Sequence, residues 1–245
     1  MVKPRIDIKD AFEGKDSLTK DEIAAYIRSI IMNASDDSIR QRISRYKKLG
    51  IIVNVKKSVY ALSEKPIYQH PEELFINRLS KIFTRQYAQI NYCIWSSAWL
   101  YDFTIHQPTQ FFYIFETESD MVETAFNLFK DNEFKAFLNP DEQSIQLYVM
   151  GQKKPVIVKQ LITRSPLVKT KKTKRPSIEK MLVDVYTDKK QFYFIQGEEI
   201  KNIFKFSFDK YTVNIPKLLN YAERRGNKNE MSDFVNSIIT NYNIL

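Results

Sequence analysis

The sequence predicts an α+β protein, with a small helical N-terminal domain and a larger mixed α/β domain whose C-terminal end is helical. Three observations lead to this class. Amphipathic helices and a two-stranded hairpin fill the first 62 residues, strands alternate with helices up to residue 163, and helical periodicity dominates after residue 176. Proline-containing polar stretches mark the breaks. We expect domains at 1–63 and 72–245, a linker at 64–71 and a basic loop at 164–176.

The N-terminal elements follow from local signals. A short helix starting at Ile8 ends near Gly14, and Thr19 with Glu22 has the spacing of a reciprocal capping box for the second helix. Ser35 or Asp36 is a good N-cap for a third helix, expected over 36–49. Gly50 suits its left-handed C-cap. Alternating residues then predict strands at 51–55 and 59–62.

Three helices followed by a hairpin is the element order of a winged helix-turn-helix, whose third helix enters the DNA major groove. Between Arg40 and Lys57 there are seven basic residues and no acidic one. Gln41 and Arg45 suit the edges of adenine and guanine, whereas Lys48, Lys56 and Lys57 suit phosphates. A protein-binding wing or a merely solvated basic face is the alternative. The predicted DNA-binding residues are Ser38, Arg40, Gln41, Ser44, Arg45, Lys48, Lys56 and Lys57.

The larger domain reads as mixed α/β. Pro71 suits the first turn of a helix over 72–87, with Leu74 on its apolar face, and Ser96 suits the cap of a short helix. Pro176 is placed similarly before a helix that carries Ile178 to Val185. Strands are predicted at 90–95, 111–115, 145–149 and 156–158, and further helices at 121–129, 197–208, 216–225 and 230–242.

The rare residue types exclude several kinds of site. The five glycines are too widely separated for a G-x-G-x-x-G turn or a P-loop. Cys93 alone cannot form a disulfide framework or a thiolate zinc cluster, and we expect it to be a buried inert thiol. His70 and His106 are isolated, and His106 has no identifiable partner as a base. No catalytic residue, metal or cofactor is predicted.

The acidic residues do not change this. Glu116 and Glu118 follow an apolar strand and resemble a nuclease carboxylate pair, but the partner strand offers Lys159 without the acid that normally precedes it. Glu179 and Asp184 lie about 140° apart on their helix, so they cannot share a metal. We expect Asp184 at the helix surface or as a cap.

A second positive region follows. No acidic residue occurs between Glu142 and Glu179, whereas nine basic ones do. Its loop could follow DNA phosphates, bind RNA or an acidic partner, or simply be a flexible solubilising segment. Arg225 could complement a helix dipole. The predicted secondary basic surface is Lys169, Lys171, Lys172, Lys174 and Arg175.

Several stretches also resemble a known family. They are 59–63 (VYALS), 93–100 (CIWSSAWL), 105–108 (IHQP), 176–184 (PSIEKMLVD) and 221–226 (YAERRG). Through them the chain resembles the AbiE-type antitoxins, the antitoxin half of bacterial type IV toxin–antitoxin systems. The resemblance implies an N-terminal winged helix that represses its own operon, a C-terminal domain needed for antitoxicity, and a nucleotidyltransferase-like toxin as partner. It also implies that Gln41, Ser44, Arg45 and Lys48 read operator DNA while Lys56 and Lys57 form the wing contact.

The leading hypothesis is therefore a non-enzymatic, antitoxin-like transcriptional repressor that binds double-stranded operator DNA. The formal charge of +9 agrees with a polyanionic partner. The absence of a signal peptide and of a long apolar run leads us to expect a cytoplasmic protein without a membrane partner. The alternatives are a nuclease or nucleotide-processing enzyme tethered to DNA, and a winged-helix protein-interaction module.

Overall fold

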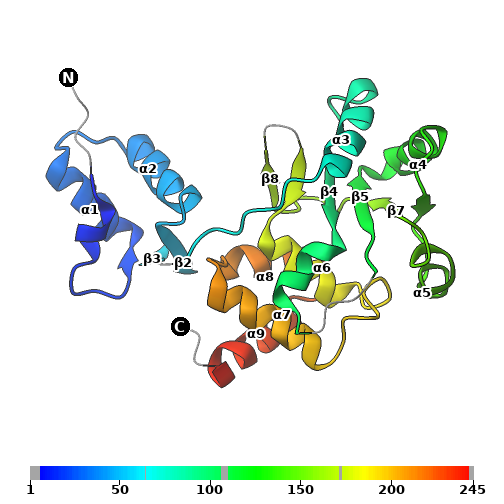
Figure 1. Ribbon diagram of the computed structural model, residues 1–245. Coiled ribbons are helices and arrows are strands. Elements are labelled where there is room, and N and C mark those ends of the chain that lie inside the picture. Colours follow the sequence, from blue (N-terminus) through cyan, green and yellow to red (C-terminus); the bar gives the residue numbers. More distant parts are fainter. Residues whose placement is uncertain (1–5, 64, 106–109, 171–172, 243–245) are drawn as a thin grey trace. The chain divides into compact units, whose positions relative to one another are not determined.

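The computed structural model describes residues 6–63, 65–105, 110–170 and 173–242 (Figure 1). The protein is mixed α+β. Its chain forms two compact units, an N-terminal unit of residues 1–68 with 208–217, and a larger unit of residues 69–207 with 218–245. The division after residue 68 falls within the predicted linker, but residues 208–217 leave the domain to which the sequence assigned them. His106, Lys171 and Lys172 lie outside the described residues.

The N-terminal unit combines short helices with a small antiparallel sheet whose strand order is β1-β3-β2. Its core consists of residues such as Ile23, Ile27 and Ile39, all 2% exposed or less. The elements are the 3-10 helix η1 (Ile8–Phe12), β1 (Leu18–Thr19), α1 (Lys20–Ile30), α2 (Asp36–Lys48), β2 (Ile52–Lys56) and β3 (Val59–Leu62).

The predicted helix caps of this unit are confirmed. The Thr19 hydroxyl accepts a hydrogen bond from the Glu22 amide at 3.2 Å, and the Glu22 carboxylate accepts one from the Thr19 amide at 2.8 Å. Ser35 caps α2 by accepting from the Ser38 amide. Gly50 follows α2 with a φ of +69°, the left-handed conformation expected of a C-terminal glycine.

Residues 208–217 join the N-terminal unit through specific contacts. The amide of Thr212 donates to the carbonyl of Pro66 at 2.9 Å, and its hydroxyl donates to the carbonyl of Lys65. The Lys65 ammonium donates to the carbonyl of Phe208 at 2.8 Å. These contacts connect positions about 150 residues apart, which no local sequence pattern reports.

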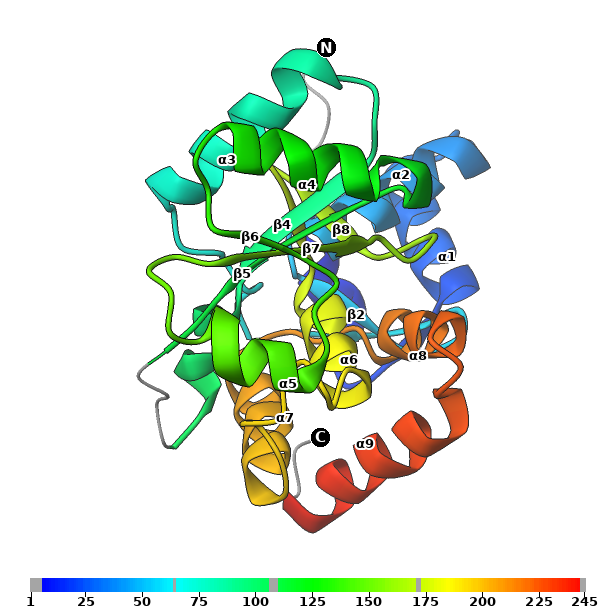
Figure 2. The same ribbon diagram turned by 90° about the vertical axis from the view of Figure 1, so that its right-hand side faces the viewer.

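The larger unit is built around a four-stranded sheet of order β4-β5-β7-β6, in which only the β4–β5 pair is antiparallel. Helices α3 and α4 lie side by side over one face, and α6 lies over the other (Figure 2). The sheet and these helices are β4 (Tyr92–Ser96), β5 (Tyr113–Thr117), β6 (Ala136–Leu138), β7 (Val156–Gln160), α3 (Leu74–Gln86), α4 (Val122–Asp131) and α6 (Ile178–Thr187).

Alternation along β5 explains these two layers. Phe115 points to the first face, where its ring lies 4.8 Å from that of Phe83 on α3 and 4.7 Å from that of Phe129 on α4. Successive strand side chains point to opposite faces, so Glu116 points toward α6.

The other elements of the larger part of the chain are η2 (Ser97–Phe103), η3 (Ser119–Met121), α5 (Glu142–Ser144), η4 (Ile145–Val149), β8 (Leu167–Lys169), β9 (Lys174–Pro176), α7 (Glu198–Lys210), α8 (Ile215–Arg224) and α9 (Lys228–Tyr242).

Two element predictions are wrong. Residues Ile145–Val149, predicted as a strand, form the π-helical turn η4. Only Ile145 and Val149 are buried there, while Leu147 and Tyr148 are each 61% exposed, so burial follows a helical rather than a two-residue period. The predicted loop at 164–176 contains an antiparallel hairpin in which Leu167 of β8 pairs with Pro176 of β9.

Neither proline predicted at a first helical turn lies there. Helix α3 begins at Leu74, three residues after Pro71, and the Leu74 side chain is 88% exposed rather than on the apolar face. Pro176 ends β9, and Ser177 is the N-cap of α6. In both places the chain reaches the helix through an extended segment, which suits a proline equally well.

Within the described residues, no helix has both the length and the apolar character needed to cross a bilayer.

Candidate functional site

Helix α2 separates its residues cleanly by face. Ile39, Ile43 and Tyr46 are buried, and their spacing places them on one side. The opposite side carries the exposed side chains predicted to read DNA, Gln41, Ser44, Arg45 and Lys48, together with the exposed Asp37 in the first turn. The helix therefore presents one continuous polar and basic surface to solvent.

The other predicted DNA-binding residues differ in their surroundings. Lys56 and Lys57 are exposed at the β2–β3 turn, where Ser58 adopts a φ of +59°. Arg40 is exposed but forms an ion pair with Asp37 at 2.7 Å. Ser38 is half-buried in the first turn, with its amide bound to the Ser35 hydroxyl. The strongest candidates are thus the exposed outer face of α2 and the hairpin turn.

Lys47 adds a further positive charge beside this face. It is half-buried, with its ammonium 5.9 Å from the centre of the Tyr60 ring. Burial lowers the pKa of Lys47, and so does the nearby charge of Lys217. Lys217 belongs to the N-terminal unit although it lies on α8, so residues distant in sequence contribute to the positive potential of this unit.

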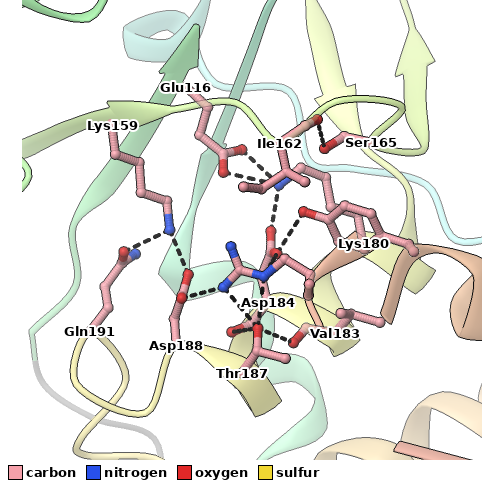
Figure 3. Close-up of polar contacts among 12 residues, drawn as sticks. Glu116, Lys159, Ile162, Ser165, Lys180, Val183, Asp184, Thr187, Asp188 and Gln191 are labelled. Carbon is pink, nitrogen blue, oxygen red and sulfur yellow. Dashed lines mark hydrogen bonds and ion pairs between the residues drawn. The ribbon is translucent and has the colours of Figure 1, made fainter. Parts of the chain in front are cut away.

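The larger unit holds a second notable feature, a buried charge network (Figure 3). At its centre, the Lys180 ammonium donates to Glu116 Oε1 at 3.0 Å and lies 2.8 Å from Glu116 Oε2. It also pairs with Asp184, one helical turn further along α6. None of these three side chains is more than 1% exposed. We define the network as Glu116, Lys159, Lys180, Asp184, Asp188 and Arg225.

Tyr221 of α8, Arg225 immediately after α8 and Lys159 of β7 make the remaining contacts of the network. The Tyr221 hydroxyl donates to Asp184 Oδ1 at 2.9 Å, and Arg225 donates to the Thr187 hydroxyl and pairs with Asp188. Lys159 of β7 bridges Asp188 at 2.7 Å and Gln191 at 2.8 Å. Three cations thus face three carboxylates, and their formal charges cancel.

The directions of the pKa shifts in the network are those of stable ion pairs. Burial alone would lower the pKa of Lys180, but the carboxylates of Asp184 and Glu116 outweigh it and hold that pKa well above its usual value. Burial would raise the pKa of Asp188, yet Lys159 and Arg225 lower it. Burial and Asp184 raise the pKa of Tyr221. Around neutral pH the Lys180 ammonium and the Asp188 carboxylate therefore remain charged.

Both carboxylates of the nuclease alternative are engaged in other contacts. Glu116 is enclosed and bound to Lys180, while Glu118 accepts hydrogen bonds from the Asn91 amide at 3.0 Å and the Asn91 side chain at 2.9 Å. Asp184 is 0% exposed, so its predicted surface or capping position is wrong. Across the described ranges, no group of three or more His, Cys, Asp or Glu is placed to hold a metal ion.

The predicted secondary basic surface is wrong for Arg175. Its side chain is 1% exposed, because its guanidinium donates to the Thr173 hydroxyl and the Pro71 carbonyl and pairs with Glu72. Lys174 donates to the side chain of Asn91 at 3.1 Å, and Lys169 is exposed.

Comparison with known proteins assigns a family. A family model described as "Family of unknown function (DUF6577)" matches residues 38–241. The chain belongs to this family. No curated protein matches it. The DUF6577 region includes every predicted DNA-binding residue, from Ser38 to Lys57, and the whole buried charge network.

Sequence reasoning missed the network of this DUF6577 member, although signals for it exist. Lys180 and Asp184 are one helical turn apart in a segment that is otherwise buried and largely apolar. Glu116 and Lys159 each end an apolar run in a buried strand, and the two strands pair with these residues in register. A charged residue inside an apolar stripe predicts a buried partner, because an isolated buried charge is too unfavourable to persist.

Proposed function

We propose that this DUF6577 member binds double-stranded DNA through its N-terminal unit, with the elements of a winged helix-turn-helix. The observation that carries the proposal is the exposed face of α2, where Gln41, Ser44, Arg45 and Lys48 lie opposite a buried face formed by Ile39, Ile43 and Tyr46. The next elements along the chain are β2 and β3, and the turn between them carries the exposed Lys56 and Lys57.

The chemistry of these side chains suits two kinds of DNA contact, to bases and to phosphates. Arg45 can bond two acceptors of guanine and Gln41 can bond adenine in the major groove. Lys48 on α2 and the wing lysines Lys56 and Lys57 suit phosphates, which position the protein without specifying sequence. Pairing of β1 with β3 anchors the hairpin to the rest of the unit, which favours a defined wing over a flexible one.

The biological role follows from the resemblance rather than from geometry. We propose a repressor of its own operon that acts as the antitoxin of a type IV system, with a nucleotidyltransferase-like toxin as partner. Co-expression tests this role: the chain should restore growth to cells that express the toxin-like product of a neighbouring gene. If the chain does not restore growth, the proposed antitoxin role is wrong, whereas the proposal of DNA binding is unaffected.

DNA binding is tested by fluorescence anisotropy with a duplex from upstream of the gene and a scrambled duplex. A protein that makes about six phosphate contacts should lose affinity with a log–log salt slope near −5. Arg45→Ala should weaken binding to the upstream duplex by about 1–3 kcal/mol and reduce its preference over the scrambled one.

The matched control is Lys9→Ala, which removes one exposed positive charge from η1 in the same unit. It should change affinity less than twofold. Equal affinity for the two duplexes, together with a harmless Arg45→Ala, would overturn specific recognition and favour the protein-interaction module.

A further inference from the structure

Helix α3 of the larger unit has a basic outer face. Its exposed Arg78, Lys81 and Arg85 follow at i, i+3 and i+7, so they share one side of the helix. No acidic residue occurs between Glu73 and Asp102, and therefore none lies on α3 itself. Within the helix, no opposite charge compensates these three cations.

A cluster of aromatic rings includes Phe75, which lies on α3 next to this basic face. The ring of Phe75 lies 4.4 Å from Tyr113 and 5.5 Å from Phe134, and Phe111 lies 5.6 Å from Tyr113. Tyr113 and Phe134 are buried, but Phe75 and Phe111 are only half-buried, so parts of both rings reach the surface.

Two cations are held over these rings. The Arg78 guanidinium carbon lies 4.9 Å from the centre of the Phe134 ring, and the Lys154 ammonium lies 5.3 Å from that of Phe75. We call Phe75, Arg78, Phe111, Phe134 and Lys154 the cation–aromatic surface. It joins α3 to residues that lie 33 to 76 positions beyond Arg78 in the sequence (111 − 78 = 33 and 154 − 78 = 76).

The segment that carries Lys154 is fixed in place. The Pro155 carbonyl accepts a hydrogen bond from the Tyr113 amide at 2.8 Å, and the Val156 amide donates to the Lys135 carbonyl at 2.9 Å. Lys135 is itself part of this hydrogen-bonded backbone and Lys153 directly precedes Lys154, and both side chains are exposed. Five basic residues, Arg78, Lys81, Lys135, Lys153 and Lys154, are thus exposed on the segments that carry these rings, against the acidic Glu133 and the half-buried Glu73, which accepts from the Tyr113 hydroxyl.

We propose that the cation–aromatic surface binds single-stranded nucleic acid. Unpaired bases stack on aromatic rings and on guanidinium groups, while flanking lysines neutralise phosphates. A duplex hides the faces of its bases, so it can use the cations of this surface but not its rings. The site is separate from α2 and goes beyond the duplex binding proposed above.

The experiment uses the full chain and fluorescein-labelled 12-nucleotide oligo(dT) and oligo(U). Arg78→Gln and Lys154→Gln should each weaken binding about fivefold and reduce the log–log salt slope by about 0.7, the value for one lost phosphate contact on a single strand. Phe75→Leu should weaken binding about fivefold without changing the slope, because it removes stacking but no charge.

The matched control is Lys130→Gln. Lys130 also lies over a ring, that of Phe126 at 5.6 Å, but on α4 outside the surface. It should leave oligonucleotide affinity within twofold, and circular dichroism melts should show that all four variants fold.

Three results would overturn the inference. One is unchanged oligonucleotide binding in the Arg78, Lys154 and Phe75 variants. Another is loss of that binding in Arg45→Ala, which would assign it to α2. The third is displacement of the oligonucleotide by polyglutamate at equal charge, which would indicate a purely electrostatic surface for an acidic protein. Because Arg45→Ala reports on duplex binding separately, failure of either proposal is distinguishable from failure of the other.

Discussion

Lys180 is the single residue on which the centre of the buried charge network depends. Its ammonium is the shared partner of Glu116 and Asp184, and all three side chains are enclosed. A buried ion pair is not strongly stabilising compared with apolar residues of the same size, but removing one partner leaves an uncompensated charge. The network therefore makes the larger unit sensitive to single substitutions at its centre.

Lys180→Met tests this sensitivity. The substitution keeps the side-chain length but leaves two buried carboxylates without their cation, so we expect a loss of about 3–5 kcal/mol in the free energy of unfolding. Urea unfolding followed by circular dichroism measures it. Adding Glu116→Gln to Lys180→Met should recover part of the loss, because it removes one of the uncompensated charges.

The control is Lys228→Met, which breaks an exposed pair with Glu223 at 3.0 Å. Exposed pairs contribute roughly 0–1 kcal/mol. Equal losses in the two variants would show that the enclosure of Lys180 has no energetic consequence.

Among the elements, α2 depends on the turn that ends it. Gly50 has a φ of +69°, and a Cβ added there would lie 2.7 Å from Cγ1 of Ile67. Gly14 has a similar φ of +72°, but a Cβ there would meet nothing within 4 Å. The two glycines thus separate the conformational cost of a left-handed residue from the cost of a steric clash.

We expect Gly14→Ala to destabilise the protein by about 1 kcal/mol, the cost of the backbone conformation alone. Gly50→Ala should cost clearly more, because Cγ1 of a β-branched side chain cannot easily move away. Thermal melts of both variants measure the difference. Ile67→Ala should reduce the cost of Gly50→Ala in a double-mutant cycle, and additive effects in that cycle would contradict the clash.

The element predictions are accurate where they depend on residues close together in the sequence. The caps at Thr19, Ser35 and Gly50 depend on residues within one helical turn, and all three are present as predicted. Residues Ile145–Val149 are predicted as a strand from their apolar content, but only the first and last of them are buried, as in a helical turn. The hairpin of β8 and β9 lacks apolar alternation, so only its pairing defines it.

For the whole molecule, the most consequential arrangement is the membership of residues 208–217 in the N-terminal unit. The segment comprises the end of α7, the turn after it and the start of α8. Tyr221, further along α8, and Arg225, immediately after α8, belong to the larger unit. The hydroxyl of Thr212 donates to the Lys65 carbonyl and also bonds with the Ser63 hydroxyl. Thr212 therefore connects residues 208–217 to Ser63 and Lys65, which directly follow strand β3.

Thr212→Val keeps the shape of the side chain but removes these hydrogen bonds. The Lys65 carbonyl would keep only the longer hydrogen bond from the Ser63 hydroxyl at 3.4 Å, so the loss should be about 1 kcal/mol. We expect faster hydrogen exchange at the Ser63 amide, which donates to the Ile51 carbonyl. The control is Thr104→Val, whose hydroxyl bonds locally to the Tyr101 carbonyl in the larger unit. Unchanged exchange at Ser63 would show that the segment does not stabilise the N-terminal unit.

The sequence alone determined the local features: the helix caps, the apolar and basic faces of α2, and most of the helices and strands. These features depend on side chains three or four residues apart along a helix, or two apart along a strand, and such spacings can be read directly from the sequence. The tertiary structure alone decided which charges are buried. Lys180 meets Glu116, 64 residues away, and Arg175 meets the chain near Pro71, 104 residues away. The physical reason is that a charge can leave water only when a partner from another element arrives to compensate it, and no local periodicity encodes that meeting.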